Sequence, residues 1–165
     1  MAAYLKLSTS LVVAGLLLTA CTIETNTEAE TEEAKIVVDD FWRAISVQDL
    51  DLLSRVVAHD EELVMFGTDA AERWIGSSAF LSAEEQMMQA FDVKRLDRRD
   101  ETLQIHLRGG VAWFSTVFDL EISVDGEVAS LTGLRTTGVL EKRNDDWVIV
   151  QSHTSVPVSG QQVEY

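Results

Sequence analysis

The first half of the chain carries apolar residues at the spacing of amphipathic helices. One such segment begins at Ala34, and its apolar positions recur three and four residues apart, with most charged positions between them. A second, short helix is predicted from Asp49 or Leu50 to Ala58, with Asp49 as its N-cap. A third is predicted from Ser78 to Phe91. We therefore expect three helices before the four long strands of the chain.

The second half has the pattern of a β-sheet. Two short apolar runs, residues 63–66 and 74–76, come first and are interpreted as brief strands on either side of a turn. Four longer segments rich in β-branched and aromatic residues follow, joined by glycine- or asparagine-bearing turns. They cover residues 94–107, 111–124, 128–142 and 147–156. Three helices followed by such a meander predict an α+β domain, with the helices on one face of a curved sheet.

The first 20 residues have the pattern of a secretory signal peptide. Lys6 is their single charged residue, and the apolar stretch after it is too short to span a bilayer comfortably. The alternative, a buried N-terminal helix, fits this uniform stretch poorly. The residues before the single cysteine resemble the lipobox of bacterial lipoproteins, Leu18-Thr19-Ala20-Cys21.

The lipobox resemblance implies cleavage before Cys21 and attachment of a diacylglycerol to its sulfur. Acyl chains on Cys21 would anchor the protein in a lipid bilayer. We expect a lipoprotein of the bacterial cell envelope that faces the periplasm or the exterior. Because Thr22 follows the cysteine, the outer membrane is the expected site in a host that has one.

Residues 21–33 are predicted to be the lipidated cysteine and an acidic tether. Glutamates and threonines dominate the segment, and only Ile23 and Ala29 interrupt its polar character, so it lacks the apolar surface needed to fold by itself. The folded domain is expected from residue 34 to 158, and residues 159–165 are expected to be a C-terminal tail. The tether would serve as a solvated spacer.

Charge and cysteine content exclude several classes of protein. The 165 residues carry 13 Lys and Arg against 28 Asp and Glu, a net charge of -15, whereas nucleic-acid binding needs clustered basic residues. A single cysteine excludes a disulfide framework and a zinc site of four thiolates. The three histidines, at positions 59, 106 and 153, form no His-x-x-x-His pair. We expect no metal site and no cofactor.

Three motifs resemble the SnoaL-like domains of the nuclear transport factor 2 superfamily. They are the loop at 64–76, the turn and strand at 109–114, and the closing strand at 147–155. The resemblance covers about residues 34 to 158. It implies a cystatin-like cone, in which three N-terminal helices pack on a curved, mainly antiparallel sheet and leave a pocket inside. It also implies that the outer face of the sheet is a candidate surface for a homodimer.

Strand periodicity supplies the first candidates for the pocket. Trp147, His153 and Ser155 share one face of the last strand if its side chains alternate regularly. If Trp147 points inward, His153 lies in the pocket beside Ser155, as a general base or a ligand donor. The alternative is a core histidine that hydrogen-bonds a backbone carbonyl.

Aromatic and charged residues supply further candidates. Trp74 and Trp113 are candidates for an apolar pocket wall, although large aromatic residues also build ordinary cores. Arg135 is either an anion anchor at the mouth of the pocket or a cross-strand partner of Glu121. Related isomerases place an acidic base in the loop that here holds Asp69, so Asp69 is a second candidate catalytic residue.

Three functional hypotheses follow. The first is a membrane-anchored protein that binds a small, partly apolar molecule in its cone. The second is an isomerase, cyclase or hydrolase with His153 or Asp69 as its base; the isomerases' tyrosine donor has no counterpart here, since Tyr4 and Tyr165 lie near the chain ends. The third is a dimeric assembly module.

Overall fold

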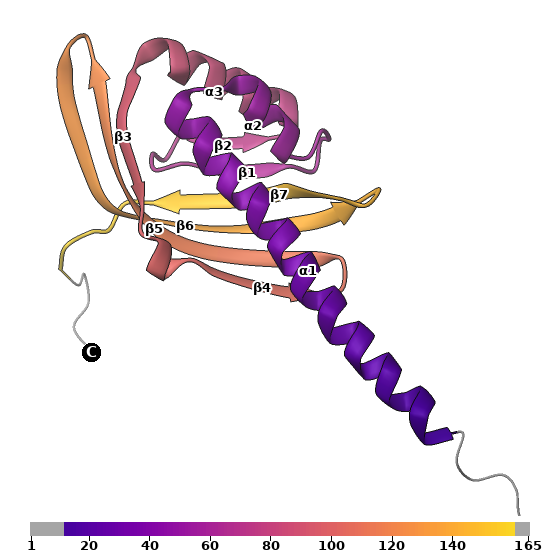
Figure 1. Cartoon of the computed structure of the whole chain (residues 1–165). Helices are drawn as coiled ribbons and strands as arrows, with labels where there is room; N and C mark the ends of the chain where they lie inside the picture. The colour runs from indigo at the N-terminus through magenta and orange to yellow at the C-terminus, as the bar shows by residue number, and fades with distance from the viewer. Residues whose placement is uncertain (1–11, 161–165) are drawn as a thin grey trace, which may run out of the picture.

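The computed structural model describes residues 12–160, with side chains from residue 27 onward, and shows three helices over one face of a curved sheet (Figure 1). The first eleven residues of the expected signal peptide, the side chain of Cys21 and residues 161–165 lie outside what is described. The helical elements are α1 (Val12–Val47), α2 (Leu50–Val56), α3 (Ser77–Ala90) and the 3-10 turn η1 (Asp100–Thr102). The strands are β1 (Val64–Phe66), β2 (Arg73–Ile75), β3 (Asp92–Arg98), β4 (Gln104–Arg108), β5 (Val111–Val124), β6 (Glu127–Arg143) and β7 (Asp146–Ser155).

The seven strands form one sheet. Their order is β2-β1-β7-β6-β5-β3, and β4 pairs with the other half of β5. All pairs are antiparallel except β1 and β7. The long strands β5 and β6 bend around the helices, and α1 crosses the open face diagonally and continues past the sheet (Figure 1). This arrangement confirms the predicted α+β cone.

The acidic segment expected to be an unfolded tether is part of α1. Glu30 attaches the end of this segment nearest the domain to the sheet. The Glu30 Oε2 atom accepts hydrogen bonds from Lys142 Nζ at 2.7 Å and from Trp147 Nε1 at 3.2 Å. Lys142 also reaches Glu33 at 3.2 Å. The hydrogen bond from Lys142 is the main cause that lowers the pKa of Glu30. The prediction of a solvated coil considered only the segment's own composition and missed these contacts with the β6–β7 hairpin.

Gln48 joins the three helices at the narrow end of the fold. The chain takes a positive φ of 55° there, which ends α1, and the Asp49 carboxylate then caps α2 by accepting a hydrogen bond from Leu52 N at 2.8 Å, as predicted. The Gln48 side chain donates to Phe91 O at 2.8 Å and accepts from Val93 N at 3.2 Å. One amide side chain therefore fixes the end of α3 and the start of β3.

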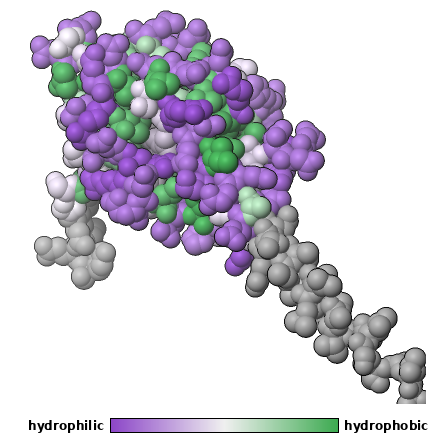
Figure 2. Space-filling model, in the orientation of Figure 1, coloured by the Kyte–Doolittle hydropathy of each residue, from purple (hydrophilic) through white to green (hydrophobic). Residues whose placement is uncertain are grey.

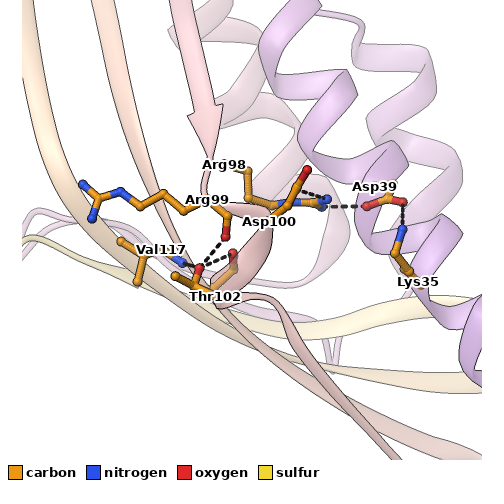
Figure 3. Close-up of polar contacts among 8 residues, drawn as sticks. Lys35, Asp39, Arg98, Arg99, Asp100, Thr102 and Val117 are labelled. Atoms are coloured by element: carbon orange, nitrogen blue, oxygen red, sulfur yellow. Dashed lines mark hydrogen bonds and ion pairs between the residues drawn. The ribbon is translucent and has the colours of Figure 1, made fainter.

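The strand predicted over residues 94–107 is interrupted. The turn η1 separates β3 from β4, because polar contacts close it locally: Thr102 Oγ1 donates to Arg99 O at 2.7 Å and accepts from Val117 N at 2.8 Å (Figure 3). Beside it, Arg98 bridges Asp100 at 2.8 Å and Asp39 of α1 at 2.7 Å (Figure 3). This ion-pair network ties α1 to the edge of the sheet.

A bulge in β7 changes which of its side chains face the helices. Val139 and Leu140 are consecutive in β6, but their partners in β7 are Gln151 and Ile149, so Val150 is an extra residue. Before the bulge Trp147 and Ile149 are buried; after it Ser152 is buried and His153 is exposed. The bulge reverses the alternation that placed His153 on the face of Trp147.

The core lies between the helices and the concave face of the sheet. Val38, Leu53, Phe114 and Ile149, from α1, α2, β5 and β7, are almost completely buried there. The surface seen in Figure 2 is mostly hydrophilic, with hydrophobic residues in small patches. Above this core, toward α3, the packing is incomplete and leaves the cavity described next.

Candidate functional site

A cavity of about 250 Å³ lies inside the cone, between α1, α3 and the concave face of the sheet. Aromatic rings form much of its wall. Trp42 packs on Phe118 with ring centroids 4.5 Å apart, and Trp74 lies 6.1 Å from Phe80. Methionine and leucine side chains fill the remaining wall, including Met65, Met87, Leu120 and Leu134. Such a partly enclosed, mostly apolar cavity is typical of small-molecule sites.

Few polar side chains line this cavity, and the hydroxyls among them are already engaged. Ser152 Oγ lies 3.2 Å from Met65 Sδ, and Thr154 Oγ1 lies 2.8 Å from Thr136 Oγ1. The other polar side chains are those of Thr68, Glu72 and Glu84. Among the described residues the two glutamates are the only charged ones that line the cavity, so this wall has acidic groups and no basic ones.

Glu84 occupies an apolar position of α3. Phe80, Glu84 and Met87 follow one another four and three residues apart, so they form one stripe along the helix, and all three line the cavity together with Phe91, the C-cap residue. Burial and, secondarily, the nearby negative charge of Glu72 raise the pKa of Glu84 to about 7. Among the described residues none donates a hydrogen bond to its carboxylate. Glu84 is therefore a half-buried acid that ionises near neutral pH without a protein partner.

The β1–β2 turn holds the second carboxylate, Glu72. Its Oε2 accepts hydrogen bonds from Thr68 N at 2.6 Å and from Asp69 N at 2.9 Å. A Cβ atom at Gly67 would overlap the Glu72 side chain, so only glycine leaves room for this arrangement. The turn thereby presents a fixed carboxylate at the cavity wall, near enough to Glu84 of α3 for its charge to act on that residue.

Trp74 is the sequence candidate that the structure places in the cavity. It is half-buried on β2 and lines the wall beside Phe80. Trp113 does not: its side chain is 42% exposed on the opposite face of β5, where it stacks on His106. Its neighbours in the strand, Ala112 and Phe114, face the core instead.

Arg135 is exposed and neither lines the cavity nor faces Glu121. It pairs in register with Val117 and Ser155, whereas Glu121 pairs with Ser130. The Asp125-Gly126 turn sets this register, because it places Val124 opposite Glu127 and so brings Arg135 level with Val117. Among the described residues, no arginine of β6 lines the cavity.

The two catalytic candidates also lie outside the cavity wall. His153 is exposed beyond the β7 bulge, and its ring lies 5.5 Å from that of Phe66. Ser155, two residues further on, is not part of the wall either. Asp69 is exposed in the β1–β2 turn, where its Oδ1 accepts a hydrogen bond from Ala71 N at 2.9 Å. A solvated turn gives Asp69 none of the burial that a carboxylate base needs.

Sequence reasoning missed Glu84 and Glu72. The signal for Glu84 was present, because a single acid interrupts the apolar stripe of α3. Glu72 gives no such signal, since its place depends on how the β1–β2 turn folds over the cavity. Within the residues described, no three acidic, histidine or cysteine side chains are grouped to hold a metal ion. In the same part of the chain, no helix is long and apolar enough to cross a membrane.

The comparisons with known proteins agree with this architecture. A family model described as a SnoaL-like domain matches residues 35–159. A nuclear transport factor 2-like superfamily protein from Salmonella enterica serovar Typhimurium has a TM-score of 0.69 at 19% identity, over 87% of this chain and 99% of that one. A ketosteroid isomerase-like protein from Erwinia carotovora atroseptica has a TM-score of 0.66 at 10% identity, over 78% and 97%. These identities show a shared fold alone. Among the curated proteins compared, none matches the chain.

Proposed function

The chain belongs to the SnoaL-like domain family, and from that premise we propose that it is a membrane-anchored protein that binds a small, partly apolar molecule inside its cone. The observation that carries the binding proposal is the cavity of about 250 Å³ with aromatic walls and two carboxylates. An engineered cavity of roughly 150 Å³ binds benzene. The cavity here suits a ligand of about one ring with a short chain.

A cavity-filling variant tests the binding proposal. Met87 lines the cavity from α3, whereas its neighbour Gln86 is exposed. We expect phenylbutanol, a ring with a short chain and a neutral head, to bind the full chain and the Gln86→Trp variant. We expect binding to weaken at least tenfold in Met87→Trp, measured by calorimetry on variants whose circular dichroism is native. Equal binding to all three proteins would place the ligand elsewhere and contradict the proposal.

A second candidate function is a proton-transfer enzyme that uses Glu84. The observation in its favour is the pKa of about 7, which suits a general acid or base near neutral pH. The cavity hydroxyls of Ser152 and Thr154 are engaged and do not supply an oxyanion donor, whereas the buried indole N–H of Trp42 has no hydrogen-bond partner among the described residues. Uptake of deuterium beside the carbonyl of phenylbutanone, followed by NMR, tests this function. Catalysed exchange that disappears in Glu84→Gln would support the enzyme over the binder.

The anchor is part of the proposal and rests on the lipobox-like residues before Cys21. If cleavage occurs there, mature α1 begins at the lipidated residue. Residues 22–29, before the contact of Glu30 with the domain, then form a helical stalk of about 12 Å at 1.5 Å per residue. Cys21→Ser is expected to abolish the lipid mass adduct and to release the chain from the membrane fraction. Unchanged fractionation and processing would refute the anchor without touching the cavity.

The homodimer stays a prediction. Val111 and Trp113 expose 40% and 42% of their surface on the outer face of the sheet, and they are the residues that such an interface would cover. Light scattering of the wild type and of Trp113→Ala would test it: a dimer that dissociates in the variant supports the interface, and a wild-type monomer contradicts it.

A further inference from the structure

We propose that the ligand is a small organic cation, a primary amine on a compact apolar body, whose ammonium group lies against the Glu84 and Glu72 carboxylates. This inference rests on the proposed binding function and names the chemical class of its ligand. It follows from which charges face the cavity, which of them already have partners, and what the remaining wall is made of.

The charges that face the cavity are unbalanced. Glu84 comes from α3 and Glu72 from the β1–β2 turn, and no lysine, arginine or histidine of the described residues lines the cavity. The neighbouring basic side chain, Arg73, is exposed and lies over the Phe66 ring, 5.8 Å from its centroid. Elsewhere in the described structure, carboxylates have basic partners, as Asp39 has in Lys35 and Arg98, and Asp119 in Arg99. The two cavity carboxylates are left for a cation that the protein itself does not supply.

The hydrogen bonds leave the same acceptors open. Thr68 and Asp69 satisfy only Oε2 of Glu72, and within the described residues neither Oε1 of Glu72 nor the Glu84 carboxylate accepts a hydrogen bond. An ammonium group has three donors and no acceptor, so it matches the open oxygens of these two carboxylates. Charge-assisted hydrogen bonds of this kind are about twice as strong as neutral ones.

The rest of the wall selects the body of the ligand. Aromatic rings from α1, α3, β2 and β5 surround the space, so a hydrated inorganic cation would lose its water shell against apolar surface. An amine with a hydrocarbon body buries that body against the rings and keeps one charged end at the carboxylates. Aromatic faces near the ammonium group would add cation–π attraction.

Proton linkage gives the inference a specific signature. An amine binds best when Glu84 is ionised, and in the free protein Glu84 ionises with a pKa of about 7. Affinity for an amine should therefore rise by up to about tenfold per pH unit below 7 and level off above it. The amine itself, with a pKa of about 10, stays protonated over this range. Asp69 and Arg73 are exposed, so they are expected to contribute little to the profile.

Three probes with one body and different heads test the inference. They are phenylbutylamine, phenylbutanol and phenylbutyrate, titrated calorimetrically into the full chain at about pH 5.5 and about pH 8. The variant is Glu84→Gln, and Glu85→Gln, an exposed neighbour on the same helix, is the matched control. We expect the amine to bind at least tenfold tighter than the alcohol at the higher pH, and the carboxylate to bind weakest.

The variants complete the expected pattern. Glu84→Gln should remove most of the amine's advantage and its pH dependence while retaining the affinity for the alcohol, and Glu85→Gln should change neither. Equal affinities for amine and alcohol would overturn the cation proposal and leave the binding function standing. So would alcohol binding that strengthens toward low pH, because it would show that protonated Glu84 donates to a neutral ligand. Absence of binding by all three probes would contradict both proposals.

Discussion

Replacing Glu84 by glutamine should change how the stability of the protein depends on pH, even without a ligand. Burial and the neighbouring Glu72 charge disfavour the ionised form and raise the pKa of Glu84 from 4.5 to about 7. The folded protein therefore binds a proton more tightly than the unfolded chain does. The associated stability is complete below about pH 4.5 and is lost as the pH rises through about 7. Glutamine keeps the shape of the side chain and has no charge to bury.

The magnitude follows from the two pKa values. One pKa unit corresponds to about 1.4 kcal/mol, so the rise to about 7 is equivalent to about 3 kcal/mol over the full range. Between about pH 5 and about pH 8 the linkage relation gives about 2.5 kcal/mol. The free energy of unfolding of Glu84→Gln, relative to that of the wild type, should increase by this amount over that interval.

Urea unfolding followed by tryptophan fluorescence measures this difference. Other carboxylates also change stability with pH, but they are present in both proteins and cancel in the comparison. Glu85→Gln, on the exposed side of α3, should parallel the wild type at both pH values. A wild-type-to-Glu84→Gln difference that is the same at both pH values would refute the assignment of Glu84 as a buried acid.

Three further variants test side-chain contacts in the domain around the cavity. Gly138→Ala should lower the free energy of unfolding by about 1–3 kcal/mol in a urea titration, since a Cβ there would overlap the Phe114 ring; an unchanged midpoint would contradict this packing. Arg98→Ala should cost about 1 kcal/mol at neutral pH. Although burial raises the pKa of Asp39, hydrogen bonds from Lys35 and Arg98 lower it overall, so this cost should fade as the pH drops below about 4, and a pH-independent cost would contradict the pairing. Glu30→Ala should speed amide hydrogen exchange in residues 27–33 by removing their contact with the β6–β7 hairpin, while unchanged exchange would show that this contact does not hold the helix.

Much of the fold could be predicted because the sequence of each helix, cap and turn carries its own local signal. The apolar period of α1, the Asp49 cap and the turns between the long strands are properties of short segments, and each appears in the structure. Two expectations failed where distant contacts decide the outcome. The acidic segment is helical and docks on Lys142 and Trp147, and the strand after α3 breaks at η1, where Thr102 bonds to β5. Composition and period carry no information about such partners.

The site was harder to predict, because the face on which a strand residue lies changes whenever an extra residue is inserted earlier in the strand. One extra residue at Val150 is enough to move His153 from the concave to the exposed face. Arg135 and Glu121 do not face each other because the Asp125-Gly126 turn fixes a register with Val124 opposite Glu127. The alternation of side chains between the two faces predicts their direction only within a stretch without a bulge. The position of a bulge depends on how the strand pairs with its neighbour, which the strand's own sequence does not show. Trp74 escaped this error because it sits in a three-residue strand without an irregularity.

The direction in which a side chain points is easier to predict in a helix than in a strand. The position of Glu84 could therefore be predicted more reliably than that of His153. An α-helix has no common equivalent of the single-residue bulge, so the spacing of Phe80, Glu84 and Met87 determines that they share a face. A carboxylate on such a stripe costs stability unless something compensates its charge. The described residues supply no compensating base, and Glu72 makes the local charge more negative. Glu84 therefore lowers the stability of the protein at neutral pH, and it lies in a cavity with room for a ligand. The simplest explanation for a carboxylate at this position is that a bound ligand provides its partner.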